Sequence, residues 1–178
     1  MIKHIFLPIL LLVCMGCTPN LTRQMQDFMG KKISFDVKFT DTSDMFDAQS
    51  RIKSDSIIKF VVLYDSTECS SCRVNRLEQY NDISDLTDRY GVRVSPIIIF
   101  SPATAQMSEL KRELRLQKLS FPIYIDSDHT FERINPCIPV DRRLHAFLLN
   151  RDNEVVLIGD PINNPALWDL YAKTINEL

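Results

Sequence analysis

Residues 57–64, with the sequence IIKFVVLY, constrain the fold of this chain more than any other segment. A short run of apolar and β-branched residues is typical of a strand that is buried on both faces of a sheet. Directly after it come the residues DSTECSSC, and then apolar residues recur at helical spacing until Gly91, a typical helix C-cap. This order predicts that Cys69 and Cys72 lie between the end of a central strand and the start of a helix.

Strand and helix patterns continue along the rest of the chain. Apolar and polar residues alternate from position 33 to 39, which indicates a half-buried strand. The further predicted elements are a strand at 92–100, a helix at 101–118 capped by Ser101, a strand at 121–126, a short helix at 127–135, a hairpin at 144–158 and a helix after Asn164. Strands that alternate with helices and end in a hairpin and a helix predict an α/β fold with one antiparallel part of the sheet.

Residues 1–16 have the layout of a signal peptide. Lys3 and His4 precede an apolar stretch at 5–13, which is far shorter than the roughly 20 residues of a transmembrane helix. We expect this segment to be removed, and the alternative is a short buried helix. Residues 17–32 are mostly polar and are predicted to form a tether, and residues 33–178 are long enough for one domain.

Gly16 and Cys17 resemble the lipobox of bacterial lipoproteins, in which a small residue precedes a cysteine that is lipidated and becomes the mature N-terminus. Cys14 stands where such boxes usually have leucine. The resemblance implies that acyl chains on Cys17 anchor the protein to a membrane without a spanning helix. It also implies an extracytoplasmic location, on the periplasmic face of a bacterial membrane.

Composition and charge exclude some classes of protein. The chain has 178 residues, of which 45% are hydrophobic and 25% are charged, as is typical of a globular protein. Its net charge is -2, and no run of Lys or Arg is longer than a pair. The sequence therefore lacks the basic surface that binding to a nucleic acid requires, and we expect no nucleic-acid partner.

Three of the five cysteines, Cys69, Cys72 and Cys137, lie in the predicted domain. An odd number of cysteines in an oxidising compartment indicates that at least one thiol is free, reactive or metal-bound. A helix N-terminus favours a thiolate, so it lowers the pKa of Cys69 from the usual value of about 8.5. Cys72, one turn further into the helix and expected to be more buried, is placed to attack a mixed disulfide.

The strand, the CSSC motif, the following Arg73 and the helix resemble the thioredoxin-like superfamily. The strand FPIYID and the short helix after it resemble the TlpA-like and redoxin branches, and LHAFLLNRDNEVVLIGDP resembles their closing hairpin. The resemblance covers residues 33–178 and implies a thioredoxin-like fold. That fold has a central mixed β-sheet flanked by helices, with an N-terminal strand and a strand-helix insertion before the final hairpin.

The resemblance also implies an activity. In such proteins the first cysteine is the exposed nucleophile and the second resolves the mixed disulfide, so Cys69 and Cys72 are the predicted catalytic residues of a thiol-disulfide oxidoreductase. The implied partners are protein thiols and disulfides together with an electron-transfer partner. No cofactor and no metal is implied.

The sequence departs from the superfamily pattern on either side of the site. Glu68 stands where the family usually has Trp, and together with Asp65 it is expected to raise the pKa of Cys69. Leu144 stands where the family places a cis-proline beside the cysteines. We therefore expect substrate docking to differ from the usual mode.

Candidate auxiliary residues are Glu68, Arg73, Cys137 and His145, and for the last two simple packing is the alternative.

Two other functions stay open. Cys69 and Cys72, with Cys137 or His145, could hold a soft ion such as Cu(I). Alternatively, the cysteine pair is a structural staple in a catalytically silent lipoprotein that binds a partner. A peroxidase is disfavoured, because DSTECSSC lacks the Pro- and Thr-rich context of peroxidase cysteines.

Overall fold

The computed structural model describes residues 20–39, 41–42, 52–54 and 57–178. The predicted signal peptide at 1–16 and the predicted lipidation site Cys17 lie outside these residues. Within the described ranges, no helix is both long enough and apolar enough to cross a membrane.

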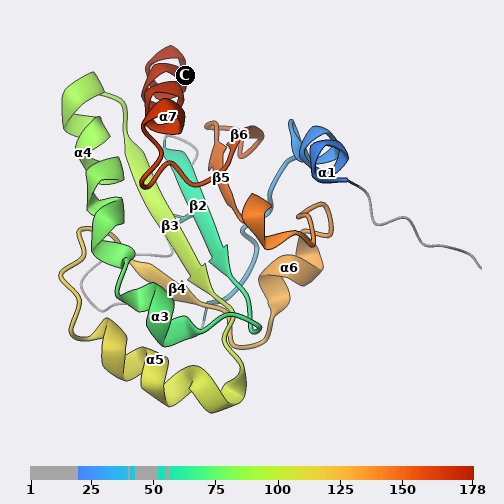
Figure 1. Cartoon of the computed structure of the whole chain (residues 1–178), viewed down its shortest axis with the longest axis vertical. Coiled ribbons are helices and arrows are strands. Elements are labelled where there is room, and N and C mark those ends of the chain that lie inside the picture. The colour runs from blue at the N-terminus through green and yellow to red at the C-terminus, as the bar shows by residue number, and fades with distance from the viewer. Residues whose placement is uncertain (1–19, 40, 43–51, 55–56) are drawn as a thin grey trace, which may run out of the picture.

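A six-stranded mixed sheet forms the centre of the structure (Figure 1). In spatial order its strands are β1 (Asp41–Thr42), β4 (Ile123–Ile125), β3 (Val94–Phe100), β2 (Ile58–Tyr64), β5 (Ala146–Leu149) and β6 (Val155–Ile158). The strands β2, β3 and β4 are parallel to one another, whereas β1, β5 and β6 pair with their neighbours in antiparallel orientation. These pairings confirm the predicted α/β fold and its mixed sheet.

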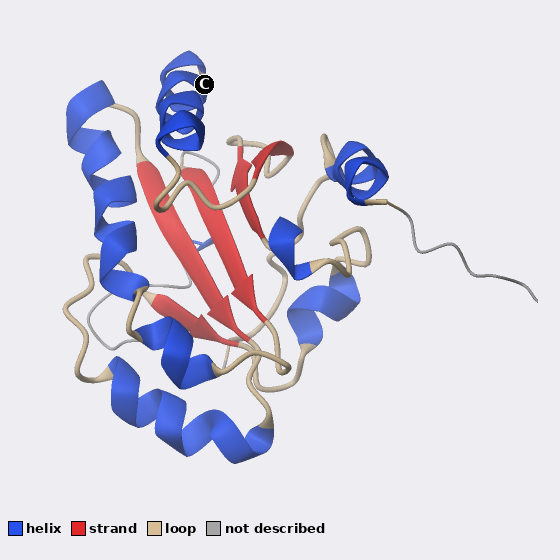
Figure 2. Ribbon diagram, in the orientation of Figure 1, coloured by secondary structure: helices blue, strands red, loops and turns tan. Residues whose placement is uncertain are grey.

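Helices surround this sheet (Figure 2). They are α1 (Leu21–Phe28), α3 (Ser70–Val74), α4 (Asn81–Tyr90), α5 (Met107–Leu114), α6 (Thr130–Ile134) and α7 (Pro165–Glu177), with 3-10 helices at Leu77–Tyr80, Thr104–Gln106 and Arg142–Leu144. The helices α3, α4, α5 and α7 share one hydrophobic cluster with the sheet, and α1 and α6 share a second. The sheet is therefore covered by helices on both faces.

The central strand β2 contributes to both clusters. Phe60 and Val62 lie in the first cluster, whereas Val61 and Leu63 lie in the second, because successive side chains of a strand point to opposite faces. All seven residues of β2 are buried, which confirms the prediction from the apolar run. The predicted C-cap is also confirmed, since α4 ends at Gly91 with a φ of 67° in the left-handed region.

The segment 33–39 differs from its prediction as a strand. Its alternation is confirmed, because Ile33, Phe35, Val37 and Phe39 are buried while the residues between them are exposed. Its backbone is nevertheless not assigned to a strand, and the N-terminal strand of the sheet is β1 at Asp41–Thr42. The side chain of Asn135 occupies the position in which a partner strand would pair with Ser34. Its Oδ1 accepts from the backbone N of Ser34 at 2.7 Å, and its Nδ2 donates to the carbonyl of Ser34 at 2.9 Å.

The described part of the predicted tether packs on the domain. Asn20 caps α1, because its Oδ1 accepts a hydrogen bond from the backbone N of Arg23 at 2.8 Å. Phe28, at the end of this helix, is completely buried, and its ring lies edge-on against Phe147 at a centroid distance of 5.0 Å. The prediction of a tether up to residue 32 is therefore wrong for residues 21–28, whose helix buries Phe28 in the core.

Candidate active site

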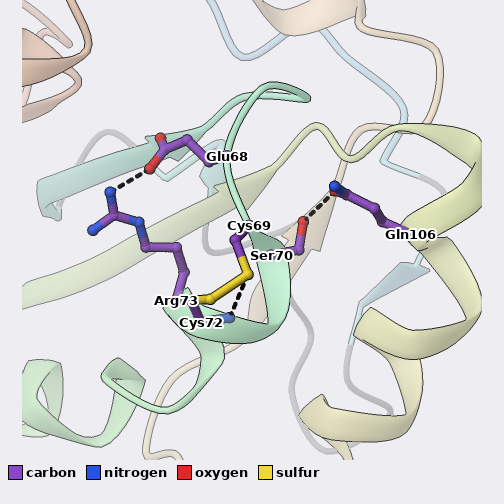
Figure 3. The surroundings of a disulfide bond; sticks show 6 residues. All are labelled: Glu68, Cys69, Ser70, Cys72, Arg73 and Gln106. Atoms are coloured by element: carbon purple, nitrogen blue, oxygen red, sulfur yellow. Dashed lines mark hydrogen bonds and ion pairs between the residues drawn. A yellow bond between two sulfur atoms is a disulfide. The ribbon is translucent and has the colours of Figure 1, made fainter.

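Cys69, which directly precedes α3, and Cys72, which lies within α3, form a disulfide with their Cα atoms 5.4 Å apart (Figure 3). Cys69 is the N-cap of α3, and its Sγ accepts a hydrogen bond from the backbone N of Cys72 at 3.3 Å. This donor would also stabilise a negative charge on the Cys69 sulfur after reduction. The predicted order of strand, cysteine loop and helix is confirmed.

Both cysteines are exposed, so the expectation that Cys72 is the more buried of the two is wrong. The helix α3 has five residues, of which Ser70 and Val74 are buried whereas Cys72 lies on the exposed side. Burial therefore does not distinguish the two sulfurs. The hydrogen bond from the backbone of Cys72 does distinguish them, because its acceptor is Cys69.

Glu68 and Arg73, which flank the motif in the sequence, form an ion pair with an Oε2 to Nη2 distance of 2.6 Å (Figure 3). The side chain of Glu68 is 6% exposed and that of Arg73 is 41% exposed. The guanidinium of Arg73 also lies 5.5 Å from the centroid of the Tyr64 ring. The Glu68 carboxylate is expected to disfavour a thiolate at Cys69, and the adjacent positive charge of Arg73 opposes this effect.

A chain of hydrogen bonds extends from Tyr64 at the end of β2. The hydroxyls of Tyr64 and Tyr80 are 3.2 Å apart, and the hydroxyl of Tyr80 donates to Oδ2 of Asp160 at 2.8 Å. Burial raises the pKa of Tyr64 to about 12 and raises that of Tyr80 further. Both phenols therefore stay neutral at physiological pH. Sequence reasoning missed all three residues, although Tyr64 ends the strand that leads into the motif.

On the other side of the motif, Ser70 ties α3 to the segment before α5. Its Oγ donates to Oε1 of Gln106 at 3.0 Å, and Ser70 itself is buried (Figure 3). The pairs Glu68 with Arg73 and Ser70 with Gln106 thus hold the two sides of the cysteine loop in place. Neither Ser70 nor Gln106 was identified from the sequence, because this contact joins residues 36 positions apart.

His145, rather than Leu144, is the residue directly before β5. Leu144 ends the 3-10 helix Arg142–Leu144 and is buried in the core, and none of the described peptide bonds is cis. The backbone carbonyl of His145 accepts from the N of Leu63 in β2 at 2.9 Å. Its side chain is buried, with Nε2 2.8 Å from the carbonyl of Pro139. That carbonyl can only accept, so Nε2 carries a proton and connects the Pro139 loop to the strand.

Cys137 is half-buried and packs against the hydrophobic cluster on the α1 and α6 side of the sheet. Within the described ranges, no three His, Cys, Asp or Glu residues come together in a group that could hold a metal ion. The described residues therefore give no geometric support to the alternative in which Cys137 or His145 joins the cysteine pair at a copper site.

A cleft of about 650 Å³ lies beside the motif. It is lined by residues of β2 and β5, of the segments directly before and after the motif, and of the loops before β5 and after β6. The charged and titratable residues among them are Glu68, Arg73, Arg76, Asp141, Arg142, Arg143, Asp160, His145, Tyr64 and Tyr80. The structure therefore brings three of the predicted auxiliary residues, Glu68, Arg73 and His145, to one cleft, and Cys137 is not among its lining residues.

The sequence matches no protein-family model and no curated protein. The structure is similar to that of a thioredoxin-like protein from Bacteroides caccae, with a TM-score of 0.52 and 13% identity over 85% of this chain and 52% of the other. It is also similar to peroxiredoxin Q from Xanthomonas campestris, with a TM-score of 0.51 and 13% identity over 83% of this chain and 96% of the other. The chain thus spans about half the length of the Bacteroides caccae protein.

Proposed function

Because the chain has a thioredoxin-like fold and a Cys69–Cys72 disulfide, we propose that it is a thiol-disulfide oxidoreductase that acts on protein disulfides. The observation that carries the proposal is the position of Cys69. This cysteine is exposed, follows the central strand, and accepts a hydrogen bond at its sulfur from the backbone of Cys72. A thiolate in such a place is both stabilised and accessible to a substrate.

The proposed reaction is an exchange of two electrons between dithiol and disulfide. The Cys69 thiolate attacks one sulfur of the substrate disulfide, the substrate S–S bond breaks, and the other substrate sulfur leaves as a thiolate that takes up a proton. The Cys72 thiolate then attacks the sulfur of Cys69 and displaces the second substrate thiolate. The substrate is reduced to a dithiol, and the protein is left with the Cys69–Cys72 disulfide that the structure contains.

We further propose that the protein works outside the cytoplasm, anchored by lipid at Cys17. The signal-peptide layout of residues 1–16 and the Gly16-Cys17 pair support this location. A partner that exchanges electrons with Cys69 and Cys72 is then needed in the same compartment. The lipid anchor would be tested by mass spectrometry of the mature N-terminus, where an unmodified Cys17 would rule it out.

The activity is tested with three variants of the full chain and a peptide disulfide. Cys69→Ser should lose turnover, because the attacking sulfur is gone. Cys72→Ser should accumulate a mixed disulfide between Cys69 and the peptide, since nothing resolves it. Cys137→Ser is the matched control for the loss of a thiol, because Cys137 packs against a hydrophobic cluster. Undiminished turnover in Cys69→Ser would rule out the proposed mechanism.

The reduction potential of the pair separates a catalytic disulfide from a structural staple. It is measured by equilibrating the protein at set glutathione ratios and counting the thiols that can be alkylated. A potential within roughly -120 to -270 mV is expected of a working oxidoreductase. A value below about -300 mV would favour the silent, partner-binding lipoprotein instead.

A further inference from the structure

The cleft beside the motif contains more positive charge than its own carboxylates neutralise. Four arginines line it: Arg73, Arg76, Arg142 and Arg143. Three carboxylates line it as well: Glu68, Asp141 and Asp160. The partner of each group decides which charges remain available to a ligand.

Two of the arginines are already paired. Arg73 is bound to Glu68 at 2.6 Å, and the guanidinium of Arg143 makes two hydrogen bonds to Asp141, at 2.9 Å from Nε and at 2.6 Å from Nη2. The guanidinium of Arg143 holds the pKa of Asp141 down at about 2, so this pair stays charged at neutral pH. Arg73 and Arg143 therefore bring no net charge to the cleft.

The third carboxylate has neutral partners. Oδ2 of Asp160 accepts from the hydroxyl of Tyr80 at 2.8 Å, and Oδ1 accepts from the backbone N of Ile162 at 3.0 Å. Both carboxylate oxygens of Asp160 thus already accept a hydrogen bond from a neighbouring residue. Its charge is partly offset by these two dipoles, which leaves it a weak competitor for a guanidinium in the cleft.

The remaining two guanidiniums have no anionic partner among the described residues. Arg142 donates from Nη1 to the hydroxyl of Thr67 at 3.2 Å, a neutral acceptor. The side chain of Arg76 makes no hydrogen bond or ion pair within the described ranges, and both arginines are exposed. These two positive charges stand in a protein whose net charge is -2.

Both unpaired arginines are close to the redox motif. Arg142 reaches Thr67, two residues before Cys69, and Arg76 follows Cys72 by four residues. A substrate that is attacked at the exposed sulfur of Cys69 would therefore bring its neighbouring residues to this cleft. Arginine is suited to bind carboxylates there, because its planar fork donates two parallel hydrogen bonds to the two oxygens.

We infer that Arg76 and Arg142 select peptide substrates that carry acidic side chains next to their disulfide. This inference rests on the proposed function and adds the class of substrate. The volume of about 650 Å³ lies within the range of ligand-binding pockets. The buried phenols of Tyr64 and Tyr80 are neutral and do not repel an anion.

The test measures binding without redox chemistry, in three fluorescent peptides whose cysteines are replaced by serine. The peptides differ only in two residues beside the former cysteines, which are Glu, Gln or Lys. The full chain should bind the Glu peptide at least about tenfold more tightly than the Gln peptide. The double variant R76Q/R142Q should reduce this preference to about threefold or less, and added salt should weaken it in the wild type.

The matched control is R89Q/R93Q, which removes the same charge from exposed arginines outside the cleft. It should keep the preference for the Glu peptide. Equal binding of the Glu and Gln peptides by the wild type, or the same loss of preference in both double variants, would overturn the inference. Glutathione is a tripeptide that itself carries carboxylates, and binding of glutathione as tight as that of the Glu peptide would overturn the assignment to a longer peptide substrate.

A second measurement separates this inference from the proposed function. The disulfide forms of the Glu and Gln peptides are given to the reduced protein, and the rate of exchange is followed. Exchange with both peptides at equal rates and equal affinities would reject the acidic preference and keep the oxidoreductase. Selective binding of the Glu peptide without exchange would reject the oxidoreductase and keep the binding site.

Discussion

The carboxylate of Glu68 and the guanidinium of Arg73 lie 2.6 Å apart and bracket the Cys69–Cys72 disulfide. Figure 3 shows the side chain of Arg73 running from the disulfide toward Glu68. The two charges are opposite and adjacent, so each limits the electrostatic effect of the other on the cysteines. Removing one partner exposes the charge of the other, and the two single substitutions should therefore have different consequences.

Glu68→Gln should make the reduced protein more reactive. The substitution leaves the positive charge of Arg73 without its carboxylate, and that charge then favours the thiolate of Cys69 over the thiol. The rate of alkylation at neutral pH should rise by about twofold to tenfold. Glu177→Gln, which removes an exposed carboxylate at the end of α7, is the control and should leave the rate unchanged. A slower rate in Glu68→Gln would contradict the proposed role of Arg73.

Arg73→Gln should reduce the stability of the oxidised protein. It leaves the carboxylate of Glu68, whose side chain is only 6% exposed, without a counter-charge. Because Arg73 itself is partly exposed, we expect a loss of about 1–3 kcal/mol in the free energy of unfolding. Urea unfolding of Arg73→Gln and of the control Arg89→Gln measures this loss.

The double variant E68Q/R73Q tests the same pair in another way. It removes both charges and should recover much of the stability that Arg73→Gln loses, since no buried charge is left unpaired. A double variant as unstable as Arg73→Gln would show that the loss comes from the packing of Arg73 on Tyr64 and not from Glu68.

Local patterns in the sequence predicted those helices and strands that are determined by residues close together in the chain. The apolar run predicted β2, the glycine predicted the end of α4, and the Asn-Pro pair predicted the start of α7, where Oδ1 of Asn164 accepts from the N of Leu167. The capping prediction at Ser101 is wrong, because Oγ of Ser101 has no hydrogen-bond partner among the described residues and Ala103 is the N-cap of the helical segment. The backbone N of Ser101 instead donates to the carbonyl of Tyr64 at 2.8 Å. This bond extends the contact between β2 and β3, so the helical segment starts only at Thr104–Gln106.

Contacts between residues far apart in the chain could not be predicted from the sequence. Lys59 stands in the apolar run and is completely buried, which is possible because its Nζ donates to the carbonyl of Ser54 at 2.8 Å and to Oδ1 of Asn153 at 2.7 Å. The cleft beside the motif also depends on contacts between distant residues, since its lining combines four separate parts of the chain. The position of the cysteine pair could be predicted from neighbouring residues, whereas the charges that surround it could not.

Asn135→Ala should destabilise the attachment of the segment 33–39. The variant loses the two hydrogen bonds to the backbone of Ser34 and a third, from Nδ2 to the carbonyl of Phe131 at 2.9 Å. Asn135 is 3% exposed, so some of the groups left behind would lack a partner, and we expect a loss of about 2–3 kcal/mol. Asn176→Ala, at an exposed position of α7, is the control. Hydrogen exchange should show faster exchange at residues 33–39 in Asn135→Ala alone.

Tyr64 should make the stability of the domain sensitive to alkali. Burial raises its pKa from 10.0 to about 12, so the folded state keeps the phenol protonated where the unfolded chain ionises. The contribution of Tyr64 to stability is therefore fully present below pH 10 and is lost as the pH rises from 10 through about 12. The full loss, reached above pH 12, corresponds to about 3 kcal/mol. Tyr64→Phe cannot ionise, and between about pH 9 and pH 11.5 its free energy of unfolding should fall by about 2 kcal/mol less than that of the wild type. Urea unfolding at both pH values measures the difference, and an equal fall in the two proteins would mean that Tyr64 ionises as readily in the folded state as in the unfolded chain.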